Sequence, residues 1–403
     1  MEKRFLILII GLLILSGCDQ TTETIDRIEI GSNIHLASRL PISATDFQVD
    51  FLNEYYDYVM PTELYHEIRE RIQGPKIILY HSIRGSWPNS NAFDWDHLDA
   101  NENMFCHKDG ERIFSVYDSW LMNVGDLVDA DDSDALDHWV NYFAVTSAEQ
   151  VYEYGYDGLY IDEATPGFSS GSVNDVIPDD CSVEDWQENI YEDIEFIKSY
   201  LPDKILIFNG LHHPEYDPDY MFDFADGGLV DSFTFKEDGT YRGEENWKEI
   251  VELVEANKEQ ELIAITAKMD DIARKVDERM FVFSTYLLLT NDNMVISMSD
   301  AGLDLDTLYF YPEYQVELGD PLDNYKVEDG FYKREFEKGV VLVNPSETET
   351  FVYNLGMSYN KVVPSGGGLL AEIYAELDLG SLDYESVSDV VLDPVSAVVL
   401  VAV

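Results

Sequence analysis

The chain contains 403 residues, with 80 Asp and Glu against 25 Lys and Arg, a formal net charge of −55 and 45% hydrophobic residues. That apolar fraction excludes a disordered acidic chain, because such chains lack the apolar surface that offsets the conformational entropy lost on folding. The negative charge excludes binding to nucleic acids and docking on anionic lipid headgroups, since both depend on basic patches.

The N-terminus has the pattern of a prokaryotic lipoprotein signal. A basic start precedes an apolar run over residues 5–15, and Cys18 follows a small-residue cleavage context. The run is shorter than the roughly 20 residues that a membrane-spanning helix needs. We therefore expect residues 1–18 to be a signal peptide ending at a lipobox, Cys18 to be lipidated, and residues 19–27 to be a tether. The mature protein is then expected outside the cytoplasm, held on the cell membrane by its lipid alone.

Residues 28–324 alternate short apolar runs with amphipathic segments. The runs that fit buried parallel strands are residues 34–36, 58–60, 76–80, 158–161, 204–208, 228–230, 262–265 and 294–297. Between them, segments such as 185–200 and 246–257 repeat apolar residues at a helical period. The alternation predicts the α/β class and a (β/α)₈ TIM barrel.

From residue 325 the pattern changes. Short β-rich runs at 332–336, 340–343, 350–353, 390–392 and 397–403 are separated by turn sequences such as Asn344-Pro345. Helical periodicity is nearly absent there, so we predict a small antiparallel, β-sandwich-like domain over residues 325–403.

Cys106 and Cys181 are the other two cysteines, and neither has a His or Cys neighbour at zinc-ligand spacing. A disulfide in an oxidising compartment and a pair of buried thiols both remain open. The carboxylate-rich segment 126–134 lacks the glycine and the closing glutamate of an EF-hand, which favours a solvated loop. We expect neither a metal ion nor a cofactor.

In a barrel of this kind the reactive side chains stand at the carboxyl ends of the strands. Polar residues follow the third to seventh predicted strands: His81 and Trp87, then Asp162 and Glu163, then Asn209 and His212, then Asp231, then Lys268. Glycosidic cleavage needs two carboxyl groups, one to donate a proton to the leaving oxygen and one to face the oxocarbenium-like centre. We predict Asp162 and Asp231 as the catalytic residues and the other six as substrate-binding residues.

Several motifs resemble one family. They are residues 155–162, Asn209-Gly210, 225–231, 311–314 followed by 318–321, and 332–346. At these positions the chain is similar to uncharacterised glycoside hydrolases of TIM-barrel type, often secreted, with a small β-domain at the end. The resemblance implies that Asp162 is a nucleophile or an electrostatic stabiliser. Such sequences commonly have a Glu after the sixth strand; this chain has Asp231, which we expect to be the proton donor, with Glu237 as a fallback.

The predicted function is hydrolysis of an extracellular poly- or oligosaccharide by a monomeric enzyme. The alternative is a non-catalytic, glycan-binding surface lipoprotein with a degenerate hydrolase barrel, which the shorter Asp231 side chain motivates. A metal-dependent hydrolase of deacetylase type ranks last, because His81, His212 and His213 follow two different strands.

Overall fold

The computed structural model describes residues 30–403 except 32–33, 41–43, 62–67, 89–91, 116–117, 126, 166–175, 180–182, 213–220, 261, 302–306 and 371–378. For residues 183–185 and 262–268 it describes the backbone only. The predicted signal peptide with Cys18, the tether and Cys181 therefore lie outside the described residues. In the part that is described, no helix is both long enough and apolar enough to cross a membrane.

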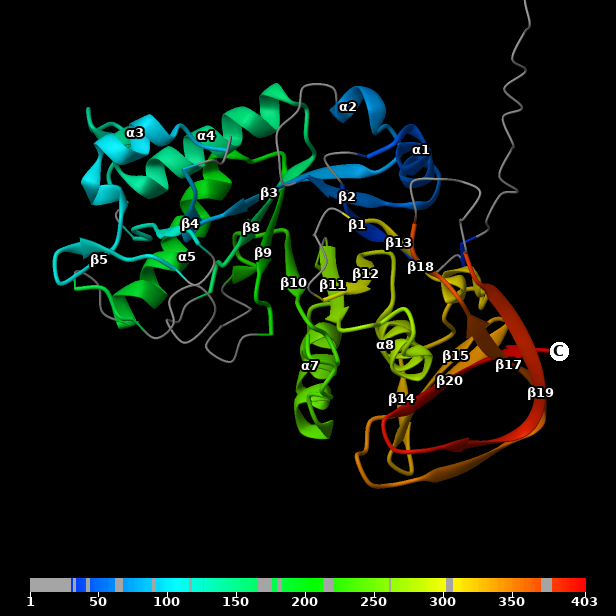
Figure 1. Ribbon diagram of the computed structural model, residues 1–403. Helices are drawn as coiled ribbons and strands as arrows, with labels where there is room; N and C mark the ends of the chain where they lie inside the picture. Colours follow the sequence, from blue (N-terminus) through cyan, green and yellow to red (C-terminus); the bar gives the residue numbers. More distant parts are fainter. Residues whose placement is uncertain are drawn as a thin grey trace, which may run out of the picture.

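Eight strands of the described chain form one parallel sheet that curls (Figure 1). In sheet order, which is also chain order, they are β1 (Ala37–Leu40), β2 (Tyr58–Pro61), β3 (Lys76–Ser82), β8 (Gly158–Asp162), β9 (Ile205–Asn209), β10 (Gly227–Val230), β11 (Leu262–Met269) and β12 (Met294–Asp300). At the two edges of the sheet, Leu36 forms a parallel bridge with Ile296. The α/β class is confirmed, and each predicted strand except the first overlaps an observed one. The first strand begins at Ala37, just after the predicted run 34–36.

Residues that point into the curl form a core of their own. Its buried members are Ile78, Tyr160, Ile205, Ile207, Leu229 and Val295, with Ala37, Tyr58, Met60 and Tyr80 packed against them. Because side chains alternate between the two faces of a strand, residues two positions further along face the same way. That alternation puts Ser82, Asp162 and Asn209 on the inner face at the carboxyl ends of their strands.

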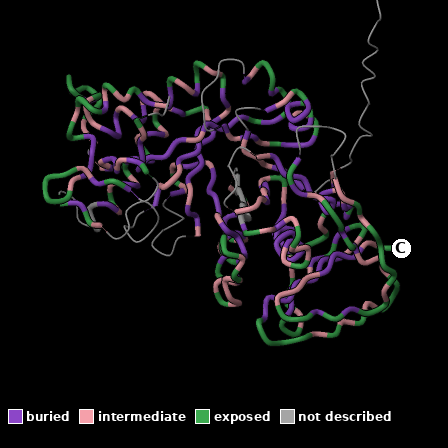
Figure 2. The backbone as a smooth tube through the Cα atoms, viewed as in Figure 1, coloured by how far each residue is buried: buried purple, intermediate pink, exposed green. Residues whose placement is uncertain are grey.

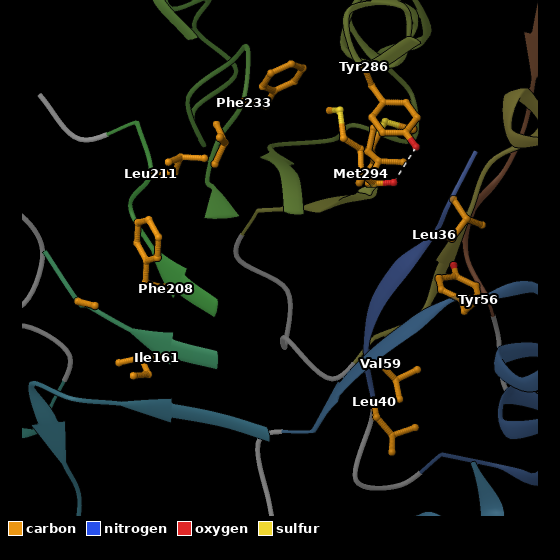
Figure 3. Packing of buried hydrophobic residues seen from close by; sticks show 14 of the residues in the cluster. Leu36, Leu40, Tyr56, Val59, Ile161, Phe208, Leu211, Phe233, Tyr286 and Met294 are labelled. Atoms are coloured by element: carbon orange, nitrogen blue, oxygen red, sulfur yellow. Dashed lines mark hydrogen bonds between the residues drawn. The ribbon is translucent and has the colours of Figure 1, made fainter. Parts of the chain in front are cut away.

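The opposite face of the strands belongs to the large core beneath the helices, and Figure 2 shows these strands as mostly buried. Ile161 of β8, Phe208 of β9 and Met294 of β12 are members of this outer core (Figure 3). The hydroxyl of Tyr286 donates to the carbonyl of Met294 at 3.3 Å, which ties a helix to the last strand.

The helices of the described chain that accompany the sheet are α1 (Asp46–Tyr55), α2 (Ile68–Arg71), α3 (Trp95–Ala100), α4 (Trp139–Glu153), α5 (Val183–Tyr200), α7 (Glu244–Ala256) and α8 (Val276–Leu289). The helices α5 and α7 are amphipathic, as the sequence predicts, whereas α8 is buried on every side from Arg279 to Leu289. In α5, the predicted apolar residues Ile190, Ile194 and Ile197 are all fully buried. Thr45 begins α1 with a capping box, in which its side chain and that of Gln48 bond each other's backbone N–H.

An insertion between β3 and α4 holds short antiparallel pairs. These are β4 (Gly85–Ser86) with β7 (Trp120–Leu121), and β5 (His107–Lys108) with β6 (Glu111–Arg112). The segments η1 (Glu102–Met104) and η2 (Ala135–Asp137) are single 3₁₀ turns. Cys106 is buried here, and its Sγ donates to the carbonyl of Met122 at 3.1 Å. Because Cys181 lies outside the described residues, a pairing of the two cysteines stays a prediction.

The predicted antiparallel strands near the C-terminus form one six-stranded sheet within the described residues. Its order is β14 (Lys326–Glu328), β15 (Phe331–Phe336), β16 (Gly339–Asn344), β20 (Ser396–Ala402), β17 (Phe351–Ser365) and β19 (Ser381–Leu392). Val341 and Val399 belong to the main core, whereas Val340 and Leu400 belong to a smaller core shared with β17 and β19. One strand pair crosses the domain boundary predicted at residue 325, since β13 (Tyr309–Phe310) pairs with β18 (Gly368–Leu369). The boundary itself stays a prediction.

Two arginines connect α8 with its neighbours, Arg334 with this sheet and Arg279 with a 3₁₀ turn. Nη1 of Arg334, on β15, donates to the carbonyls of Leu287 and Thr290 at 3.1 and 2.8 Å and so caps the carboxyl end of α8. Arg279 of α8 forms an ion pair with Glu313 in η4 (Pro312–Gln315), and both side chains are 0% exposed. Because Tyr286 of α8 bonds β12 and Arg334 of β15 bonds the end of α8, both sheets contact this helix.

Candidate functional site

Asp162 is the last residue of β8, and four donors converge on its carboxylate. The Tyr80 hydroxyl donates to Oδ2 at 2.5 Å, and the Asn209 side-chain amide donates to Oδ1 at 2.5 Å. The backbone N–H of Glu163 and the hydroxyl of Tyr160 reach Oδ1 at 2.8 and 3.5 Å. Groups from the adjacent strands β3, β8 and β9 thus hold the side chain in one orientation, in which both oxygens accept.

The tyrosines beside Asp162 remain neutral phenols. Burial, reinforced by the negative charge of Asp162, raises the pKa of Tyr80 well above its usual value, although Arg39 opposes part of that rise. Burial and the charges of Asp162 and Asp231 raise the pKa of Tyr160 in the same direction. The Arg39 guanidinium lies over the Tyr80 ring, with 5.0 Å between Cζ and the ring centroid. Both phenols can therefore donate hydrogen bonds, but neither can serve as an anionic nucleophile.

Glu163 makes the turn that leaves β8. Its φ of 56° lies in the left-handed region, which non-glycine residues rarely adopt. The Ser82 hydroxyl donates to Oε2 at 2.7 Å, and the oxygen of that hydroxyl accepts the N–H of Gly85 at 3.1 Å. Oε1 is buried, and no group of the described chain forms a hydrogen bond with it. The two oxygens of this carboxyl group therefore have different surroundings.

Asp231 follows β10 in a similar turn. Ser232 has a φ of 50°, and its N–H donates to Oδ1 of Asp231 at 2.9 Å. Arg242 donates to the carbonyls of Ser232 and Asp231 at 2.5 and 3.4 Å and holds the turn in place. The negative charges of Asp231 and Asp162 both raise the pKa of the Tyr160 phenol.

His81 does not join these residues. It neighbours Tyr80 on β3, so it points to the other face of the sheet. Its ring centroid lies 4.8 Å from that of Phe93 and 5.9 Å from that of Phe143, and Nδ1 lies 3.0 Å from Oγ of Ser147. Burial lowers the pKa of His81 to about 3, so the ring is neutral. The predicted substrate-binding residue is a packed residue of the outer core.

The remaining predicted residues are Trp87, His212, Lys268 and Glu237. Trp87 and His212 are partly exposed. The backbone of Lys268 pairs with Ser299 on β12, and its side chain lies outside the description, as does His213. The fallback Glu237 is exposed, and its carbonyl accepts the N–H of Asp270 at 2.8 Å.

Sequence reasoning missed Tyr80, Tyr160, Ser82 and Arg39 because it considered residues that follow each apolar run. The sequence contained the information needed to find Tyr160. Residues two positions apart on a strand share a face, so Tyr160 lies on the same face as Asp162 at the end of β8. Across the described ranges, no group of three or more His, Cys, Asp or Glu residues could hold a metal ion.

Comparisons with solved structures return glycoside hydrolases at low identity. The glycoside hydrolase domain of PelA from Pseudomonas aeruginosa has 15% identity and a TM-score of 0.44, covering 68% of this chain and 96% of that one. An α-amylase from Geobacillus thermoleovorans, complexed with acarbose, has 12% identity and a TM-score of 0.45, covering 92% and 99%. A GH27 β-L-arabinopyranosidase from Geobacillus stearothermophilus has 11% identity and a TM-score of 0.47, covering 92% and 96%.

No curated protein matches the chain. A family model does match, over residues 76–340, and its description is "Hypothetical glycosyl hydrolase family 15". The match spans β3 to β12, and so includes Asp162, Glu163, Asn209 and Asp231, and it extends to β16. Because it covers well over half of the chain, the protein belongs to hypothetical glycosyl hydrolase family 15.

Proposed function

We propose that this protein hydrolyses glycosidic bonds of a poly- or oligosaccharide with two carboxyl groups, at the carboxyl end of a closed (β/α)₈ barrel. The observation that carries the proposal is Asp162, an inward-facing carboxylate that four donors from three strands hold in place. Membership of a glycosyl hydrolase family supports the same reaction class.

The geometry at Asp162 suits the stabilisation of positive charge. Cleavage of a glycosidic bond builds oxocarbenium character at the anomeric carbon. A carboxylate whose orientation is fixed before the reaction stabilises that charge without reorganisation. In this proposal Asp162 faces the anomeric carbon, as nucleophile or electrostatic stabiliser, and Asn209 fixes the carboxylate from β9.

Asp231 is the second carboxylate of the proposed pair. Its Oδ1 accepts the N–H of Ser232, while Arg242 holds the backbone of the turn. The shared influence of Asp162 and Asp231 on Tyr160 supports placing the two carboxylates on one sugar-binding surface.

We also propose that the mature chain acts as a monomer outside the cytoplasm, held to the membrane by a lipid on Cys18. Metabolic labelling with a fatty acid tests the anchor: the parent should incorporate label, and Cys18→Ser should not. Label in both, or in neither, contradicts it.

The function is tested by reducing-end release from a panel of polysaccharides and oligosaccharides. The parent should cleave at least one substrate. Asp162→Asn and Asp231→Asn should each lose at least about a hundredfold in rate, whereas the control Glu153→Gln, an exposed position on α4, should not. Binding to a glycan without any reducing-end release would identify the non-catalytic alternative, and full activity in Asp162→Asn would remove the assignment of that residue. Loss of activity on addition of a chelator would favour the metal-dependent hydrolase of deacetylase type.

A further inference from the structure

We propose that Glu163, rather than Asp231, carries the proton that passes to the glycosidic oxygen. This inference rests on the proposed function and assigns a catalytic role within the same site. It follows from the hydrogen bonds of Asp162, Glu163 and Asp231.

Asp162 is poorly suited to donate the proton. Both of its oxygens accept hydrogen bonds, and the partners are two phenols, a side-chain amide and a backbone N–H. A proton on either oxygen would displace one of these donors. Asp162 therefore fits the role of the carboxylate that faces positive charge.

Glu163 presents two unequal oxygens. The Ser82 oxygen already accepts the N–H of Gly85, and its hydroxyl proton is directed to Oε2 of Glu163 at 2.7 Å. Oε1 is shielded from water and accepts no hydrogen bond from the described residues. An oxygen that accepts nothing is a better place for a proton than one that already accepts a hydroxyl donor. When this carboxyl group is protonated, the proton therefore lies on Oε1.

A glycosidic oxygen can supply the acceptor that Oε1 lacks. Glu163 is partly exposed, and its Oε2 accepts the hydroxyl of Ser82, which lies on the inner face with Asp162, so its carboxyl group lies on the side of the sheet where the sugar is proposed to bind. Rotation about the terminal side-chain bond exchanges the two oxygens and brings the acid proton toward the sugar. The left-handed backbone of Glu163 fixes the start of that side chain in a conformation that glutamate does not favour.

The proton leaves Oε1 for the glycosidic oxygen as the bond from the anomeric carbon to that oxygen breaks, and the bonding electron pair goes to the leaving oxygen. Glu163 becomes a carboxylate, and the positive charge at the anomeric carbon faces Asp162. A water oxygen then bonds to that carbon and loses a proton to Asp231. Asp231 is thus assigned as the base.

The test compares leaving groups. Glu163→Gln, Glu163→Ala, Asp231→Asn and the control Glu153→Gln are assayed on 2,4-dinitrophenyl and 4-methoxyphenyl glycosides of the sugar that the parent releases. Both Glu163 variants should lose about 10²–10⁴-fold on the methoxyphenyl glycoside, whose oxygen needs protonation. On the dinitrophenyl glycoside, which leaves without a proton, they should stay within roughly tenfold of the parent.

Equal losses on both glycosides would make Glu163 a structural residue and overturn the proposal. Parental rates in both Glu163 variants would also overturn it. The same would follow if Asp231→Asn, and not the Glu163 variants, lost activity only on the methoxyphenyl glycoside. Thermal unfolding checks that each variant folds, and Glu163→Gln preserves the side-chain shape if the alanine variant does not fold. A parent that cleaves no glycoside overturns the proposed function and this inference together. An active parent with unaffected Glu163 variants overturns the inference alone.

Discussion

Glu163 and Ser232 adopt the same left-handed turn, one after β8 and the other after β10. Their φ angles are 56° and 50°, and each donates its N–H to Oδ1 of the aspartate before it, at 2.8 and 2.9 Å. The turn folds the backbone back onto the carboxylate and limits its rotation. Backbone strain of this kind, typically about 1–3 kcal/mol, persists where the surrounding structure enforces it, and it clusters at functional sites.

Substitution of Ser232 measures that strain. Ser232→Gly removes the Cβ that makes the left-handed region unfavourable, so the free energy of unfolding should stay equal or rise by up to about 1 kcal/mol. Ser232→Val places a β-branched side chain there and should lower it by about 1–2 kcal/mol. Urea unfolding measures both, with Ser388→Val on exposed β19 as a control expected within about 0.5 kcal/mol. Equal stability of the glycine and valine variants would show that the turn is not strained.

The Tyr80 hydroxyl should hold the Asp162 carboxylate in its working orientation. Tyr80→Phe removes the donor at 2.5 Å, so kcat/KM should fall by about tenfold or more. Tyr160→Phe removes a contact of 3.5 Å and should have a smaller effect. Initial rates on the substrate that the parent cleaves measure kcat/KM for both variants. If the two variants lose the same activity, the short contact has no special role.

Stability at acidic pH should depend on His81. Burial lowers its pKa to about 3 from the ordinary value of 6.5, so between these values the unfolded chain binds a proton that the folded chain does not. The contribution of His81 is therefore fully present above pH 6.5 and falls as the pH drops, by up to about 1.4 kcal/mol per pH unit. His81→Leu should reduce the slope of unfolding free energy against pH between 6.5 and 4.5. Phe143→Leu, beside His81, removes apolar volume but no titratable group; it is the control and should leave the slope unchanged. A parental slope in His81→Leu would contradict this explanation.

Removal of one partner of the buried ion pair Arg279–Glu313 should strongly lower the free energy of unfolding. Arg279→Met leaves Glu313 without its ion partner at a fully buried position and should lower the free energy of unfolding by about 3–5 kcal/mol. The double variant Arg279→Met/Glu313→Leu removes both charges and should recover a large part of that loss. Lys326→Met, which breaks the exposed pair with Asp323, should cost less than about 1 kcal/mol. A double variant no more stable than the single one would show that the arginine acts mainly through its other contacts.

Sequence periodicity is a local property, and it predicted the local structure well. The helical spacing of Ile190, Ile194 and Ile197 identified the buried face of α5, because residues one turn apart share a face. Asp162 and Asn209 were identified as strand-end residues because parallel strands deliver their carboxyl ends to one edge. The start of β1 was placed too early, because residues 34–36 are as apolar as a strand although Leu36 forms only an isolated bridge.

The partners of those residues are not a local property. Tyr80 and His81 are adjacent in the sequence, and both are large and polar; the strand sends one to Asp162 and the other into the core beside Phe93. Which of the two faces inward depends on the register of β3 against β8, and register is set by pairing between segments far apart in the chain. The sequence by itself therefore determined the class of elements, their order and the carboxylates at strand ends. Only the tertiary structure decided which donors surround Asp162, that His81 is buried, and that one oxygen of Glu163 accepts no hydrogen bond from the described residues, because each depends on the contact of separate strands.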